Sequence, residues 1–160
     1  MQETGTSVVV KEVGSGISAE VAVRLKRRAS KRLTWPAGVE PRGMRWKPKE
    51  RQRQGKPAET TFADWGIPTD EALIAVRQAV PGLQIVASGG IRTGLDIAKS
   101  IALGADMAAF GQPLLAAALA SPEKVVEFIA GIIHEIKITM LCVGAKNLDA
   151  LKNISLVCRP

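Results

Sequence analysis

The chain has 160 residues, of which 46% are hydrophobic and 23% charged, a composition typical of one globular domain with its own core. No apolar stretch reaches the roughly 20 residues of a membrane-spanning helix, and residues 1–18 lack the basic start and apolar middle of a secretion signal. We therefore expect a cytoplasmic protein without a membrane partner. The net charge is +7, but residues 24–56 hold 13 of the 22 Lys and Arg and only two of the 15 acids, so the positive charge belongs to one segment.

The first predicted elements are a strand and two helices. Residues 7–13, SVVVKEV, form a β-branched run that predicts a strand, and residues 17–25 show helical spacing after two turn glycines. Residues 69–80 predict a helix with Thr69 as its N-cap, acids in its first turn and a Pro-Gly stop.

The later elements repeat the alternation of strand and helix. Apolar runs predict strands over residues 83–88 and 106–110, and helical spacing follows each of them, over residues 95–103 and 114–120. Residues 121–152 predict the C-terminal helices, the first capped by Ser121 and ending near residue 143, the second over residues 145–152. Strands that alternate with helices in this way predict a parallel sheet covered by helices.

Residues 87–94, ASGGIRTG, place two glycines where a strand passes into a helix. Backbone N–H groups of such a turn can approach an anion, the helix dipole favours negative charge, and Arg92 adds a bidentate donor for phosphate. A Gly-Gly turn can also serve only to permit positive φ, so this turn alone leaves both readings open. The second strand end, FGQP, favours phosphate, because barrel loops after the last two strands often bind it. We interpret Lys11, at the first strand's end, as a ligand contact.

Four segments carry a family resemblance: VVVKEVGSGIS, FADWGIPT, ASGGIRTGLDIAKSIALGAD and GAKN, in this order. Together they resemble the second half of the type II isopentenyl-diphosphate isomerases, which are FMN-dependent (β/α)₈ barrels. The resemblance covers most of residues 7–152 and implies an α/β fold, the C-terminal half of a TIM barrel. Residues 1–160 would then be a partial FMN-binding domain, with residues 121–152 as its C-terminal helices. The candidate cofactor-binding residues are Lys11, Gly89, Gly90, Ile91, Arg92, Gly111 and Gln112.

The resemblance also implies an activity. The family interconverts isopentenyl and dimethylallyl diphosphate in isoprenoid biosynthesis by moving a double bond, with reduced FMN, Mg²⁺ on the substrate diphosphate, and NAD(P)H to keep the flavin reduced. It implies a homo-oligomer for the full-length protein. The family's basic substrate-binding residues and Mg²⁺-binding carboxylate lie in the half that has no counterpart here. We therefore assign no catalytic residue and no metal ligand, interpret His134 as a surface or boundary residue, and expect little or no isomerase activity from the chain alone.

Two other functions stay open. An FMN-dependent oxidoreductase similar to the 2-hydroxyacid oxidases would need a His and Arg set for its carboxylate substrate, and this half has no histidine near a strand end. A nucleic-acid-binding module would use the basic segment, because Lys and Arg neutralise phosphates and Trp stacks on bases. Charge alone favours a solvated loop over such a module.

The basic segment occupies the place where the resembling family has a strand and loop similar to ALDVAGxGGTSW. When the third base of each codon is read with the first two of the next, residues 29–46 can spell VKALDVAGRGGTSWDAV with permitted codons. We infer that residues from about 26 to somewhere between 47 and 60 are translated out of frame. This explains the segment's Arg, Pro, Gly and Trp without a nucleic-acid partner. We expect the aberrant insert, residues 26–56, to be disordered and to disrupt one strand–loop unit.

Overall fold

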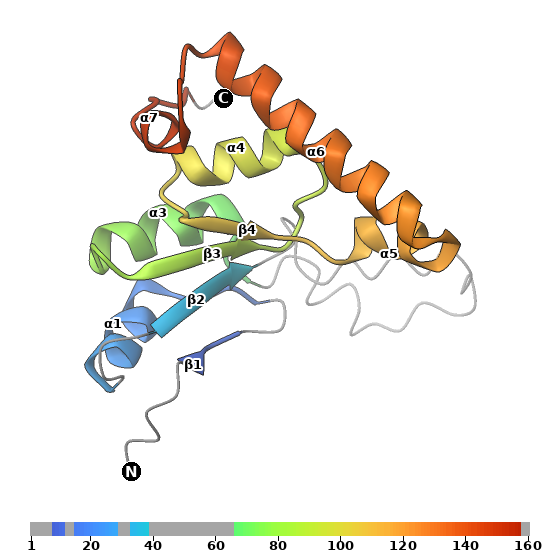
Figure 1. The fold of residues 1–160 in the computed structure, drawn as a ribbon. Helices are drawn as coiled ribbons and strands as arrows, with labels where there is room; N and C mark the ends of the chain where they lie inside the picture. Colours follow the sequence, from blue (N-terminus) through green and yellow to red (C-terminus); the bar gives the residue numbers. More distant parts are fainter. Residues whose placement is uncertain (1–7, 12–14, 29–32, 39–65, 158–160) are drawn as a thin grey trace, which may run out of the picture.

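The computed structural model describes residues 8–11, 15–28, 33–38 and 66–157. Its strands form one parallel sheet in sequence order (Figure 1): β1 (Val8–Val9), β2 (Leu33–Gly38), β3 (Gln84–Ser88) and β4 (Met107–Ala109). Because every strand neighbours the next one in the chain, right-handed crossovers place all intervening helices on one face. This is the arrangement in an arc of a (β/α)₈ barrel, as predicted.

Three helices cover this face of the sheet: α1 (Ala19–Arg28), α3 (Thr69–Ala79) and α4 (Gly94–Ala102). The core lies between α3, α4 and the sheet. Leu73 and Val76 of α3 and Ile85 and Ala87 of β3 have no exposed surface, and Ile101 of α4 joins the same apolar cluster. Burying one of the larger of these side chains stabilises the fold by about 1.5–3 kcal/mol. The end of β3 that leads into α4 is therefore firmly fixed.

The last three helices are α5 (Gln112–Ala120), α6 (Pro122–Cys142) and α7 (Leu148–Lys152). Pro113 lies in the first turn of α5, and the Ser121 hydroxyl accepts a 3.3 Å hydrogen bond from the Lys124 N–H, so Ser121 caps α6 as predicted. α7 begins three residues later than predicted, because Asn147 caps it. None of the described helices is long and apolar enough to cross a membrane.

β2 lies inside the insert that we expected to be disordered. α1 continues to Arg28, and residues 33–38 pair with β1 on one side and β3 on the other. The expectation is therefore wrong for residues 26–28 and 33–38, while residues 29–32 and 39–56 lie outside the described part. The physical reason is that ladder hydrogen bonds use backbone groups, which an altered side-chain sequence retains. Pro36 is tolerated because β1 reaches only as far as Thr34, so only β3 neighbours the strand at the proline.

Candidate anion-binding site

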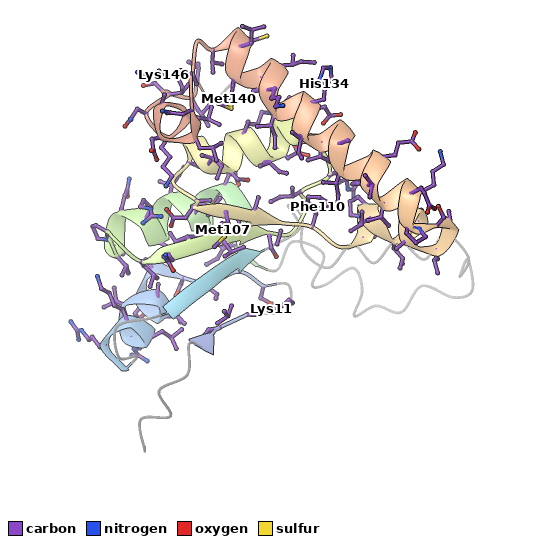
Figure 2. All side chains as sticks on the ribbon, viewed as in Figure 1. Lys11, Met107, Phe110, His134, Met140 and Lys146 are labelled. Carbon is purple, nitrogen blue, oxygen red and sulfur yellow. The ribbon has the colours of Figure 1, made fainter. Side chains whose placement is uncertain are left out.

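A cavity of about 280 Å³ opens at the carboxyl ends of β3 and β4, beside the residues that follow β1. Lys11 and Phe110 both line this cavity. Figure 2 shows that they follow β1 and β4, at the same end of the parallel strands. All seven residues predicted from the sequence line this one cavity: Lys11, Gly89, Gly90, Ile91, Arg92, Gly111 and Gln112. The fold thus brings together residues that are up to a hundred positions apart in the chain. Their role toward a ligand stays a prediction at this point.

The turn after β3 needs its two glycines. Gly89 and Gly90 have φ values of 91° and 72°, in the left-handed region that residues with a Cβ rarely adopt. The turn is also attached to α3, because the Thr69 hydroxyl donates a 3.4 Å hydrogen bond to the carbonyl oxygen of Gly89. Thr69 is therefore not the N-cap that we predicted. It is the first residue of α3, Pro68 is the N-cap, and α3 has no side-chain cap bond, since the hydroxyl reaches across to Gly89 instead.

Two carboxylates accept hydrogen bonds from the backbone N–H groups at the start of α4. These N–H groups are therefore not available to an anion, although the sequence suggested that they would be. Asp96 accepts from the N–H groups of Arg92 and Thr93, at 3.1 and 3.0 Å, and Thr93 accepts from the Asp96 N–H in return, forming a capping box. Glu135 of α6 accepts from the Gly94 N–H at 2.6 Å. The residues of this turn that line the cavity ahead of the capping box are Gly89 to Ile91.

The capping box also sets the charge state of Asp96. Partial burial opposes ionisation, but hydrogen bonds from the Thr93 hydroxyl and from the Arg92 and Thr93 N–H groups outweigh it, with help from the charge of Lys99. The pKa of Asp96 is consequently held below its ordinary value of 3.8. At neutral pH this carboxylate is ionised and keeps the start of α4 fixed.

The described lining of the cavity carries positive charge and no acid. Lys11, after β1, and Arg92, after β3, contribute two cations, and both residues are exposed to solvent. Gly111 has a φ of −128°, and a Cβ built there would meet no described atom within 4 Å. Neither its backbone nor its packing among these residues requires glycine. A ligand atom close to the backbone would require it, which fits a phosphate cradled by N–H groups.

The volume limits what this cavity can hold. Its 280 Å³ lies just below the range of roughly 300–1,000 Å³ that small-molecule pockets span. The described residues therefore fit the phosphate end of a cofactor better than a complete flavin nucleotide.

The sequence did not predict that Thr69 and Glu135 contact this turn. Their contacts span 20 and 41 residues, and no local pattern marks them. His134 behaves as predicted: it is exposed on α6 (Figure 2), away from the cavity. Within the described ranges no group of three or more His, Cys, Asp and Glu side chains could hold a metal ion.

Comparison with known proteins identifies the class. The family of FMN-dependent dehydrogenases matches residues 63–157, well over half of the chain, and the chain belongs to this family of flavoproteins. Among its curated relatives are the isopentenyl-diphosphate delta-isomerases of Mycobacterium marinum, 41% identical over 156 residues, and of Xanthobacter autotrophicus, 43% identical over 152 residues. The resemblance seen in the sequence is confirmed. The chain spans about 43% of the length of each relative, which in turn cover 92% and 93% of this chain.

Solved structures support the same fold at lower identity. A lactate oxidase of Pediococcus acidilactici matches 95% of this chain with a TM-score of 0.63 and 26% identity, and the match covers 36% of the oxidase. A mandelate oxidase with (S)-2-phenylpropionate matches 94% of this chain with a TM-score of 0.67 and 25% identity, covering 39% of that protein. The chain is therefore a partial barrel, and its sequence is nearer to the isomerases than to the oxidases.

Proposed function

We propose that this chain is the FMN-phosphate-binding part of an FMN-dependent isopentenyl-diphosphate delta-isomerase. The observation that carries the proposal is the convergence of Lys11, Arg92 and the Gly89–Gly90 turn on one cavity. A doubly charged phosphate suits the Arg92 guanidinium and a cluster of backbone N–H groups, and Lys11 adds a second positive charge to the same cavity. Membership of an FMN-dependent family supports FMN as the source of that phosphate.

Each lining residue has a distinct task in this proposal. The N–H groups of Gly89 to Ile91 bind phosphate oxygens, and the Arg92 guanidinium binds them from the outer side. Gly111 lets the second strand end approach the phosphate without a Cβ, and Gln112 adds an amide donor. Lys11, which comes from the other end of the sheet, contacts the cofactor beyond the phosphate.

The proposed reaction interconverts isopentenyl and dimethylallyl diphosphate, the chemistry that the names of the curated relatives indicate. When bound and reduced, FMN supplies the proton-transferring group. Substrate and product are isomers, so one proton is added, another is removed, and no net oxidation occurs. We further propose Mg²⁺ as the counter-ion of the substrate diphosphate, NAD(P)H as the flavin reductant, a homo-oligomer and a cytoplasmic location. The residues that contact the metal and the substrate would belong to the part of such an isomerase that this chain does not cover.

A titration of the 160-residue chain with FMN and with riboflavin tests the cofactor proposal through quenching of flavin fluorescence. Riboflavin lacks the phosphate, so FMN should bind at least about tenfold more tightly, because a charged hydrogen bond contributes about 1.5–3 kcal/mol. Arg92→Ala should remove most of that difference. Arg24→Ala is the matched control, since Arg24 pairs with Glu20 inside α1 at 3.0 Å. Equal affinity for the two flavins would contradict the proposal.

The activity requires a second experiment. A hybrid chain, in which the part of the Mycobacterium marinum isomerase that this chain does not span precedes these 160 residues, is assayed with FMN, Mg²⁺ and NADPH. We expect conversion of isopentenyl to dimethylallyl diphosphate. Oxidation of lactate or mandelate by the same hybrid, without isomerisation, would favour the oxidase alternative that the solved structures represent.

A further inference from the structure

Glu135 connects α6 to the turn that leads into α4. Its carboxylate accepts a 2.6 Å hydrogen bond from the N–H of Gly94, the first residue of α4, across 41 positions in the chain. A charged acceptor at so short a distance makes a strong hydrogen bond. Gly94 itself is buried, so this bond is formed in a partly dry environment where it is strengthened further.

The two helices touch backbone to backbone at this point. A Cβ on Gly94 would lie 2.5 Å from the carbonyl oxygen of Ile132 and 2.8 Å from the backbone nitrogen of Ile136. Ile132 is the buried residue of α6, so the contact forms part of the packed interior. The position of α4's first turn is therefore set by α6, with Glu135 supplying the directional bond.

The same turn carries the candidate phosphate donors. Gly94 follows Arg92 by two residues, and Arg92 lines both the anion cavity and a second cavity of about 490 Å³. Glu135 lines this second cavity, together with the Lys124–Glu127 ion pair of α6. A shift of Gly94 would displace Arg92, because Asp96 accepts from the N–H groups of Arg92 and Thr93 and ties residues 92–96 together. Gly89 to Ile91 directly precede this tied segment.

We propose that Glu135 is a positioning residue for flavin-phosphate binding. By holding the Gly94 N–H, it fixes the orientation in which Gly89 to Arg92 present their donors to the cavity. The inference rests on the proposed function, in which this turn binds the FMN phosphate. It makes a prediction of definite sign. A carboxylate near a phosphate repels the phosphate by Coulomb's law. If charge were the only effect of Glu135, removing its carboxylate would tighten FMN binding. If Glu135 positions the turn, removing the carboxylate weakens FMN binding.

The test measures FMN and riboflavin affinities of the 160-residue chain by fluorescence quenching for four variants. Glu135→Ala should weaken FMN binding about tenfold and leave riboflavin binding unchanged, as expected for the loss of one charged hydrogen bond. Glu135→Gln retains an acceptor oxygen and should stay within about threefold of the parent chain. Glu135→Asp keeps the charge but is one methylene too short, so it should lose FMN affinity as Glu135→Ala does. Glu127→Ala is the control, because Glu127 pairs with Lys124 of the same helix at 2.6 Å.

The results separate the two proposals. A parent chain that binds FMN and riboflavin equally overturns the proposed function and this inference with it. A parent chain that prefers FMN, with Glu135→Ala equal to it or tighter, overturns the positioning role alone. If Glu135→Ala and Glu135→Asp lose the same affinity for FMN as for riboflavin, the positioning role is also overturned. A purely structural role would lower the affinity for both flavins equally. Should Glu135→Ala fail to fold, the comparison of Glu135→Asp with Glu135→Gln decides.

Discussion

The guanidinium of Arg77 in α3 donates a 2.8 Å hydrogen bond to the carboxylate of Asp106, just before β4. The same guanidinium donates to the carbonyl oxygens of Leu83 and Gly104. The carboxylate also accepts from the Ile85 N–H and from Lys152 of α7, both at 2.9 Å. This network joins a helix, the two strands that border the anion cavity, and the last helix.

Asp106→Asn should lower the free energy of unfolding by about 2 kcal/mol. The amide retains one acceptor oxygen but turns an NH₂ toward donors, and a partly buried guanidinium loses its counter-charge. Urea unfolding followed by circular dichroism measures the effect. Glu127→Gln, in the exposed pair with Lys124, should change stability by less than about 0.5 kcal/mol. Equal effects of the two substitutions would refute the importance of the network.

Stability should fall on the acid side. Burial raises the pKa of Asp106, but the hydrogen bonds from Lys152, the Ile85 N–H and Arg77 outweigh burial and hold the pKa below 3.8. The pKa of Asp96 is also lowered. A carboxyl with a lowered folded pKa contributes stability above its unfolded pKa and loses it as pH falls through the folded value. Urea midpoints should therefore drop as the pH falls below about 4. The drop should be smaller in Asp106→Asn, and an unchanged acid profile in that variant would contradict the assignment.

Gly111→Ala should weaken FMN binding without destabilising the chain. Its negative φ accepts alanine, and the added methyl meets no described atom, so only an approaching ligand would clash with it. Gly131→Ala in α6 is the control. It also has open space at the Cβ, should gain roughly 0.5–1 kcal/mol from helix propensity, and should leave FMN binding unchanged. Flavin titration together with urea unfolding distinguishes the two outcomes, and unaltered FMN affinity in Gly111→Ala would exclude close approach there.

The outer faces of α5 and α6 should bind a hydrophobic dye. Leu119, Val126 and Leu141 are 80%, 68% and 81% exposed, and β4 lies at an edge of the described sheet with Met107 half exposed. Exposed apolar groups and open strand edges promote association. The double variant Val126→Lys/Leu141→Lys should show lower dye fluorescence and a smaller hydrodynamic size in sedimentation. Absence of dye binding by the parent chain would count against this expectation.

Replacing residues 29–45 by VKALDVAGRGGTSWDAV, which keeps the chain length, should raise the urea midpoint and tighten FMN binding. The replacement supplies the backbone N–H that Pro36 lacks and restores the strand and loop that the resembling family has beside the candidate cofactor-binding residues. A scrambled version of the same replacement controls for composition. Resequencing the gene is the direct check: codons that cannot spell DVAGRGGTSW in another frame would refute the frame-slip hypothesis.

Periodicity predicted most of the elements, because buried positions along helices and parallel strands repeat at fixed spacing. It also located the candidate site, since the carboxyl ends of parallel strands must meet at one edge of the sheet. The contacts of Thr69 and Glu135 could not be predicted, because they depend on how helices cross in space. β2 was missed for a different reason: its side-chain pattern is abnormal, while its pairing with β1 and β3 uses backbone groups that every sequence has, except at proline.

Six of the seven predicted site residues lie between Gly89 and Gln112, and Glu135 and Asp96 support that region from the same uninterrupted stretch of chain. Among the described lining residues, only Lys11 comes from the other side of the insert. The anion-binding half of the site can therefore be inherited or transplanted as one continuous piece of sequence. Under the proposed function, an error in the gene between residues 26 and 56 would weaken contacts with the rest of the cofactor and leave the proposed phosphate contacts intact.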